Sequence, residues 1–234
     1  MCGINGLITS STEKDVFNSL KKMNDIIFHR GPDSSGTYIK KINIATKISS
    51  VIGMGMRRLS IIDLENGNQP IISECDNYVI VFNGEIYNYE KLKSSLIKKF
   101  NINFKTNSDT EVILKLYQKY GSESFKMLDG MFSFSIYDNI QKKIFLARDY
   151  FGEKPLYYTK NNKGFYWASE LKSIINVIDK KPEISKRAVS IYFQLTYIPS
   201  PYSIYEKIYK VNPNSYIEID TKTLELKNFE ISKK

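Results

Sequence analysis

Apolar side chains recur along the chain with two different spacings, which predict where helices and strands lie. Over Thr12–Phe28 the apolar positions are 16, 20, 23 and 27, the spacing of one face of a helix. A second amphipathic helix is predicted at 89–100 by the same criterion. A third begins at Ser108, where SDTE has the form of a capping box: Ser108 accepts from first-turn amides and Glu111 reaches back.

Shorter runs rich in β-forming residues predict strands before, between and after these helices. They lie at about 3–8, 36–40, 43–49, 53–62, 78–82, 131–138, 143–148, 155–159 and 164–169, followed by a short helix from Glu170. Strands that cluster in sequence, with helices grouped between the clusters, are typical of α+β packing and not of regular βαβ alternation.

The character of the chain changes beyond Lys181. The stretch YIPSPYSIYEKIYKVNPNSYIEI holds three prolines in 23 residues, which indicates a linker, and the ending LELKNFEISKK is not an obvious domain end. We therefore expect one domain over residues 1–181. Residues 182–234 are expected to be a linker and the start of a truncated C-terminal domain, so that the chain is the front part of a longer protein.

Composition limits the class of protein. With 42% hydrophobic and 13% aromatic residues, a chain of 234 residues can bury a sizeable core. It has no apolar run near 18 residues, and its start lacks the apolar core of a signal peptide. Two cysteines offer no disulfide framework, so a reducing cytoplasm is the expected location.

The net charge is +9, from 34 Lys and Arg against 25 Asp and Glu. Such a balance raises the question of a nucleic-acid partner. The lysines come mostly in pairs spread along the chain, and they form no block of five or six. This distribution favours a solvated lysine-rich surface, and we expect neither nucleic acid nor a membrane as a partner.

The opening MCGIN places one of the two cysteines directly after Met1. An N-terminus is usually a frayed end. Removal of Met1, however, would leave Cys2 with both a thiol and a free α-amine, which titrates near pH 7.7–8.0 and can accept the thiol proton. One residue then supplies nucleophile and base. The sole histidine, His29, lies between a helix and a Gly-Pro loop, where a structural role is at least as common, and zinc sites built on several histidines are excluded.

Further polar residues suit an amide or amino-acid substrate. In VFNGEIYN, Asn83 and Gly84 offer a side-chain amide and an unobstructed backbone N–H for an oxyanion hole, although Asn-Gly is also a strong hairpin signal. Arg58 could bind a carboxylate bidentately, and Glu85 and Asp109 could pair with an ammonium group. Each has an ordinary alternative: a surface ion pair, a solvated glutamate and an aspartate favoured in a first helical turn.

Taken together, these stretches resemble the glutaminase domain of class II glutamine amidotransferases, most closely that of glutamine-hydrolysing asparagine synthetases. The matching stretches are CGI from Cys2, HRGPD from His29, RLSIID from Arg58, NGEIYN from Asn83, SDTEVIL from Ser108, DGMFSFSIYD from Asp129, ARDYFGEKPLYY from Ala147 and ASELKSI from Ala168. They occur in the family's order over about 1–175, and YIPSPYSIYEKIYKVNP is similar to its link into a second domain. RLSIID and RDYFGEKPLYY favour the asparagine synthetase branch.

The resemblance implies a fold and a reaction. The fold is the N-terminal nucleophile hydrolase type, a four-layer αββα sandwich of two antiparallel sheets between helices. Cys2 would attack the side-chain amide of glutamine, with its own α-amine as general acid and base, and hydrolysis of the thioester would release glutamate and ammonia. No metal or cofactor is implied for this step. The implied roles are Asn83 and Gly84 for the oxyanion, Arg58 for the α-carboxylate, Glu85 and Asp109 for the α-ammonium, the backbone of Ile61 and Ile62 for the pocket wall, and Arg30 and Asp33 for ordering the neighbouring loop.

Two features depart from the family pattern. The family's second domain binds ATP and activates aspartate with a pyrophosphate loop, and no Ser-Gly-Gly-Xaa-Asp-Ser stretch occurs here. ATP and magnesium would therefore belong to a synthetase domain that receives the ammonia. Met1 also still precedes Cys2.

Two rival interpretations stay open. One is an amidotransferase of the same family acting on another acceptor, such as a sugar acid in polysaccharide assembly. The other is a non-catalytic binding module that kept the fold. The sequence also leaves a homodimer open.

Overall fold

Two antiparallel six-stranded sheets pack face to face in the computed structural model, which describes residues 1–42 and 50–232. The first sheet has the order β10 (Tyr209–Lys210), β8 (Tyr157–Asn161), β9 (Gly164–Ala168), β1 (Gly3–Thr9), β3 (Ser50–Arg58) and β2 (Ser34–Ile42). The second has the order β12 (Leu226–Glu230), β11 (Ser215–Asp220), β7 (Lys143–Arg148), β6 (Gly130–Asp138), β5 (Tyr78–Ile86) and β4 (Ile71–Ile72). The strand expected at 43–49 lies outside the described residues.

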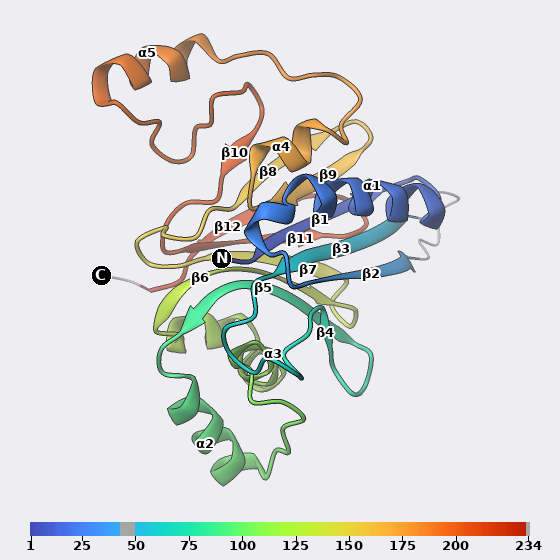
Figure 1. Cartoon of the computed structure of the whole chain (residues 1–234), viewed down its shortest axis with the longest axis vertical. Helices are drawn as coiled ribbons and strands as arrows, with labels where there is room; N and C mark the ends of the chain where they lie inside the picture. The colour runs from blue at the N-terminus through green and yellow to red at the C-terminus, as the bar shows by residue number, and fades with distance from the viewer. Residues whose placement is uncertain (43–49, 233–234) are drawn as a thin grey trace.

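Helices cover the outer faces of both sheets, as Figure 1 shows. On the first sheet lie α1 (Glu13–Ile26) and α4 (Leu171–Ile175), and on the second α2 (Tyr89–Phe100) and α3 (Asp109–Tyr120). Two 3-10 turns, η1 (Phe28–Arg30) and η2 (Gly121–Met127), follow α1 and α3, and α5 (Lys186–Leu195) projects beyond the sandwich. The αββα sandwich expected from the resemblance is confirmed. No helix in the described ranges is long and apolar enough to cross a membrane.

Three apolar clusters hold the layers together, because each sheet must bury both of its faces. Ile4, Met54 and Trp167 of the first sheet meet Val81 and Leu146 of the second in the central cluster. On the outer faces, α1 and α4 pack on the first sheet, and α2 and α3 pack on the second. The apolar positions predicted for the first helix are all buried: Val16, Leu20, Met23 and Ile27.

The structure differs from the expected elements in two places near α3 and β3. The strand expected at 53–62 ends at Arg58, because the chain leaves the sheet there and enters a loop. Ser108 caps α3 by accepting from the Thr110 amide at 3.2 Å. The other half of the capping box is wrong: Glu111 accepts from the amides of Lys105 and Thr106, and so fixes the loop before the helix.

The C-terminal region is more closely integrated than the sequence suggests. β10 pairs with β8, and β11 pairs with β7 in a register that places Ile217 opposite Leu146. Residues 209–230 therefore complete both sheets, where the sequence places a linker and the start of another domain. The sequence did not indicate these strands, because the region before them is rich in proline, each strand is short, and its partners lie far away in the sequence.

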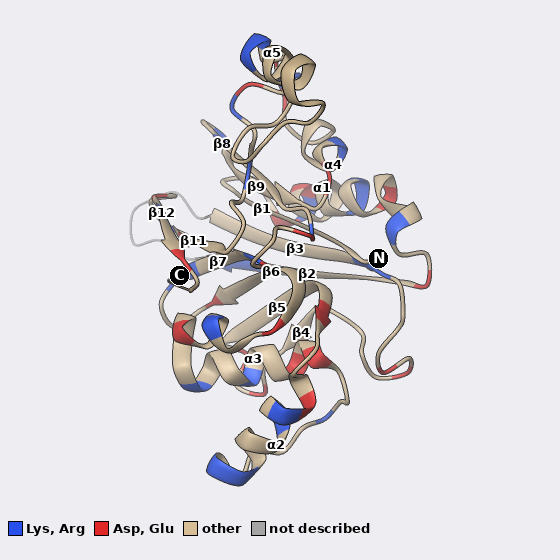
Figure 2. Ribbon diagram, turned by 90° about the vertical axis from the view of Figure 1, so that its left-hand side faces the viewer, with Lys and Arg blue, Asp and Glu red and all other residues tan. Residues whose placement is uncertain are grey.

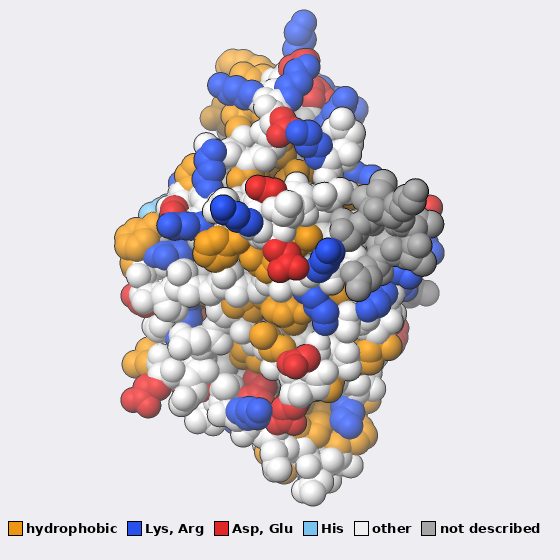
Figure 3. Space-filling view, turned by 90° about the vertical axis from the view of Figure 1, so that its right-hand side faces the viewer, with side chains coloured by type: hydrophobic (Ala, Val, Ile, Leu, Met, Phe, Trp, Pro, Cys, Tyr) orange, Lys and Arg blue, Asp and Glu red, His pale blue; other side chains and the backbone are white. Residues whose placement is uncertain are grey.

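Charged residues are distributed over the surface. Figure 2 shows Lys and Arg on several helices with Asp and Glu interspersed, and the face in Figure 3 likewise mixes both signs. The expectation of a solvated lysine-rich surface agrees with these views.

The loop between β7 and β8 is held by the Arg148–Asp149 pair. Each carboxylate oxygen of the buried Asp149 accepts two backbone N–H groups, at 2.9–3.2 Å, from Phe132, Phe151, Glu153 and Lys154. Arg148 Nε donates to the Lys154 carbonyl, and its Nη1 donates to Val211, both at 2.8 Å. The backbone on both sides of Lys154 is thus fixed, which directs this side chain toward the N-terminus.

We predict that Asp149→Asn lowers the free energy of unfolding by about 2–5 kcal/mol, because the new amide faces two backbone donors and leaves them unsatisfied. Asp220→Asn is the matched control: only one carboxylate oxygen of Asp220 accepts backbone N–H groups, from Lys222 and Thr223, and an amide oxygen can replace it. Urea unfolding of both variants measures the difference. Equal stabilities of the two variants would contradict the role given to Asp149.

Candidate active site

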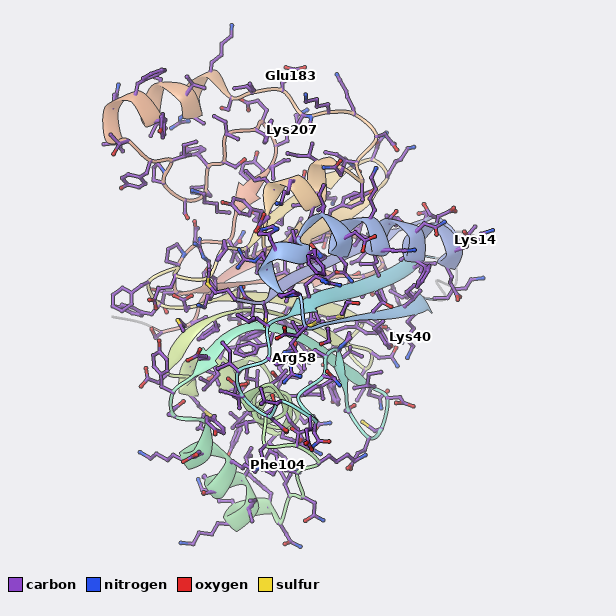
Figure 4. The ribbon with its side chains drawn as sticks, in the orientation of Figure 1. Lys14, Lys40, Arg58, Phe104, Glu183 and Lys207 are labelled. Atoms are coloured by element: carbon purple, nitrogen blue, oxygen red, sulfur yellow. The ribbon has the colours of Figure 1, made fainter. Side chains whose placement is uncertain are left out.

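A pocket lies where the start of β1, the end of β3, the second half of β5 and the first turn of α3 meet. It is lined by Met1, Cys2, Arg58, Leu59, Ile61, Ile62, Gly67, Gln69, Phe82, Asn83, Gly84, Glu85, Ser108, Asp109, Thr110 and Lys154. Figure 4 shows Arg58 in the middle of the molecule, at the end of β3. The structure therefore brings together the residues expected for nucleophile, oxyanion and substrate α-groups, and Ile61 and Ile62, expected in the pocket wall, also line it.

Cys2 is partly buried, immediately before β1 begins. Its Sγ lies 3.4 Å from the amide nitrogen of Leu59, which points an N–H at the sulfur. Burial raises the pKa of the thiol, while the Leu59 N–H, the N-terminal ammonium and Arg58 act in the opposite direction. Asp33, expected to order the neighbouring loop, accepts from the Ser60 amide at 2.8 Å, next to Leu59.

Met1 forms part of the pocket wall and is 57% exposed. Its Sδ lies 3.4 Å from Lys154 Nζ. While Met1 is present, the nitrogen of Cys2 is a peptide nitrogen and has no basic lone pair. A base at this nitrogen therefore requires removal of Met1.

Asn83 lies inside β5 and not in a turn. The β5 strand pairs with β6 without interruption, with Asn83 opposite Ser133 and Gly84 opposite Phe132, so the hairpin alternative is wrong. The Asn83 side chain is 1% exposed, and its Nδ2 has no hydrogen-bond partner within the described residues. Buried donors are nearly always satisfied, so a free amide in a pocket wall is a ready site for an acceptor.

Gly84 is required by the close approach of β6. A Cβ at this position would lie 2.1 Å from the carbonyl oxygen of Met131. Gly84 therefore lines the pocket with backbone alone, beside the free amide of Asn83.

Two carboxyl groups, Glu85 and Asp109, form the acidic side of the pocket. Asp109 is buried, and burial, with the nearby Glu85 charge adding to it, raises its pKa to about 6 despite the N–H of Ile86 that it accepts at 3.1 Å. Neither carboxyl group has an ion-pair partner in the part of the chain that the structure describes. A cation bound here would relieve the repulsion between them.

Arg58 lies in the pocket wall with its terminal nitrogens already engaged. Nη2 donates to the carbonyls of Ile62 and Asp63 at 3.0 and 2.6 Å, and Nη1 donates to Leu64 at 3.2 Å and Asn68 Oδ1 at 3.3 Å. These four contacts fold residues 59–68 over the guanidinium. A bidentate carboxylate contact would have to replace some of them, which sequence reasoning did not foresee.

Two pocket residues, Gln69 and Lys154, were missed from the sequence. Gln69 bridges β5 and α3, accepting from the Phe82 amide at 2.7 Å and donating to Thr110 Oγ1 at 3.2 Å. Lys154 reaches the pocket from the RDYFGEKPLYY stretch, whose position in the sequence carries no signal of that proximity. Arg30, expected to order the neighbouring loop, donates its Nε to the carbonyl of Cys2 at 2.9 Å. His29, with its side chain 54% exposed, contacts Glu170 and does not line the pocket.

Comparisons with known proteins agree with this geometry. A family model described as "Glutamine amidotransferase domain" matches residues 1–230. A putative asparagine synthetase [glutamine-hydrolyzing] 2 of Methanocaldococcus jannaschii is 41% identical over 98% of this chain and 46% of its own length. Asparagine synthetase [glutamine-hydrolyzing] 1 of Bacillus subtilis is 41% identical over 94% of this chain and 33% of its own length. The chain thus spans less than half the length of these relatives.

A solved structure shows the same fold. The glutamine phosphoribosylpyrophosphate amidotransferase of B. subtilis superposes with a TM-score of 0.68 at 19% identity, over 99% of this chain and 49% of its own. The matches to the family model and to the two relatives agree with the arrangement of Cys2, Asn83 and the acidic pair in one pocket. The chain belongs to the family of glutamine amidotransferase domains and is related to the glutamine-hydrolysing asparagine synthetases.

Proposed function

We propose that the chain, once Met1 is removed, hydrolyses L-glutamine to L-glutamate and ammonia through a thioester on Cys2. The observation that carries the proposal is the free, buried amide of Asn83 in the pocket that also holds the Cys2 thiol. Family membership and the names of the relatives support glutamine as the substrate.

The reaction uses one residue as nucleophile and base. The α-amine of Cys2 accepts the thiol proton, and the sulfur attacks the amide carbon of glutamine. Asn83 Nδ2 and the Gly84 N–H stabilise the resulting oxyanion, where one such donor contributes about 10²–10³ in rate. The protonated amine gives its proton to the departing nitrogen, ammonia leaves, and water hydrolyses the thioester with the same amine as base.

Glutamine is oriented by its α-groups. The ammonium group lies between Glu85 and Asp109, where it neutralises two neighbouring carboxylates. The α-carboxylate binds Arg58, and the guanidinium then gives up some of its hydrogen bonds to the carbonyls of residues 62–64. The loop of residues 59–68, with Ile61 and Ile62 in the pocket wall, then surrounds the bound substrate as well as the Arg58 guanidinium.

The ammonia serves an amidation elsewhere in a longer protein. We propose that a synthetase domain uses ATP and magnesium to activate aspartate and form asparagine. We also propose that both domains are cytoplasmic. The names of the two relatives and the extent of their chains beyond the matched region support this assignment. The pocket itself contacts only glutamine, so another acceptor, such as a sugar acid, remains the alternative.

We predict that Cys2→Ala abolishes ammonia release from glutamine and that Cys2→Ser retains very little, because a hydroxyl ionises far less readily than a thiol near neutral pH. Cys75→Ala is the control, since Cys75 is exposed and remote from the pocket. Intact mass must first show that Met1 is absent, and a sample that fully retains Met1 is expected to be inactive. Steady turnover by Cys2→Ala would refute the mechanism, and glutamine binding without turnover by the processed wild type would indicate a binding module.

Asn83→Asp is expected to lower kcat by at least about 10²-fold, because it removes a donor and adds negative charge beside the developing oxyanion. Asn161→Asp is the control: Asn161 lies at the β8–β9 turn, and its Oδ1 accepts from Lys163 and Gly164, which an aspartate also does. Kinetics and melting temperature are measured for both variants. If Asn83→Asp lost both kcat and its folded structure while Asn161→Asp lost neither, Asn83 would have a structural and not a catalytic role.

Glutamine affinity should depend on pH through Asp109. Its raised pKa, about 6, means that the carboxylate needed for the ammonium contact is lost as pH falls through this value. Between pH 7 and pH 5 the affinity should fall about tenfold, measured by calorimetry in the Cys2→Ala variant. Asp109→Asn should bind weakly at every pH, with a flat profile. A flat profile in the parent variant would separate Asp109 from the ammonium.

A further inference from the structure

The backbone of Cys2 is held by side chains and not by the sheet. Strand pairing of β1 begins at Gly3, opposite Arg57 of β3, so the Cys2 carbonyl lies outside the ladder. This carbonyl accepts from Arg30 Nε at 2.9 Å. Without that bond, the sulfur contacts at Leu59 would be the remaining hydrogen bonds of Cys2 among the described residues. A terminal residue with so few contacts would fray.

Arg30 is in turn held by Glu170, just before α4. Arg30 Nη1 lies 3.1 Å from Glu170 Oε1, and the same carboxylate contacts His29 Nε2 at 2.8 Å and Lys172 Nζ at 3.3 Å. Burial acts to raise the pKa of Glu170, but the hydrogen bonds from these three residues hold it below the ordinary value. Glu170 is therefore a charged acceptor at the centre of a basic cluster.

Ser169, which directly precedes Glu170, holds the start of β1. The Ser169 amide donates to the Ile4 carbonyl at 2.8 Å, and Ser169 Oγ accepts from the Ile4 amide at 3.0 Å. Ser169 thus fixes the residue that follows Gly3, while Glu170 acts through Arg30 on the residue that precedes it. The end of β9 consequently anchors the strand from which the nucleophile projects.

We propose that Glu170 is a positioning residue for Cys2: it orients Arg30, which fixes the Cys2 carbonyl and with it the direction of the thiol. The catalytic consequence rests on the proposed glutaminase function. Reacting atoms must lie about 3–3.5 Å apart in an aligned geometry, and a misplacement of about 1 Å costs on the order of 10² in rate. Glu170 does not touch the pocket and acts only through Arg30.

The test compares Glu170→Gln with Glu218→Gln in processed protein. Glu218 is a matched control, because it is also partly buried (18% exposed against 22%) and forms an ion pair, with Lys143 at 2.8 Å, but lies on β11 away from Cys2. Glu170→Gln should lower kcat about tenfold or more with KM for glutamine within about twofold, since the pocket residues are unchanged. Glu218→Gln should change neither.

Alkylation by iodoacetamide gives a second readout that needs no glutaminase activity. In Glu170→Gln, the released Cys2 should react at least about fivefold faster than in wild type, because a thiol freed from a buried position is more accessible. Cys75 is exposed and serves as the internal reference, with an unchanged rate. Faster reaction with iodoacetamide and slower turnover of glutamine together indicate lost positioning.

Each result decides a separate claim. An unchanged kcat, an unchanged Cys2 alkylation rate, or equal acceleration of Cys2 and Cys75 would overturn the role of Glu170. A wild type that lacks glutaminase activity would refute the proposed function, and the alkylation rates would still show whether Glu170 holds Cys2.

Discussion

The site depends on the position of β1 in the middle of a sheet. The first strand of the chain pairs with β3 on one side and β9 on the other, and every residue of it is buried. An end that would otherwise be mobile is thereby paired into the first sheet, and the N-terminus lies near the level at which the two sheets meet in Figure 1. Because the strand cannot shift without breaking two ladders, Gly3 has a defined place relative to β5, and the bond from Arg30 Nε then holds Cys2 just before it.

The two walls of the pocket come from different sheets. Cys2 directly precedes β1 and Arg58 ends β3, both strands of the first sheet, while Asn83 and Gly84 lie within β5 of the second. Sheet packing therefore sets the distance between nucleophile and oxyanion donors. Donors held in a rigid strand cost no reorganisation when charge develops, which is the condition under which they stabilise a transition state most.

The pocket also separates opposite charges. Arg58 and the loop that it folds lie on one side, and Glu85 and Asp109, which have no ion-pair partner among the described residues, lie on the other. An α-amino acid carries a cation and an anion on one carbon, so it can satisfy both sides at once. A ligand with only one of these charges would leave the acidic pair or the guanidinium without a new partner.

The sequence by itself determined α1–α4 and most strands up to β9, because apolar periodicity is a local signal, whereas α5 lies in the stretch that the sequence indicates as a linker. It also located the chemistry, since Cys2 after Met1, the NGEIYN stretch and Asp109 at a helix start are recognisable residue by residue. The tertiary structure alone decided which distant segments pair. Strands β10–β12 complete the sheets, and Asn83 inside β5 has a donor without a partner among the described residues. Arg58 already holds a loop, and Glu170 reaches Cys2 through Arg30. The longest of these contacts, between Arg30 and Glu170, joins residues 140 positions apart, and no spacing within one segment encodes it.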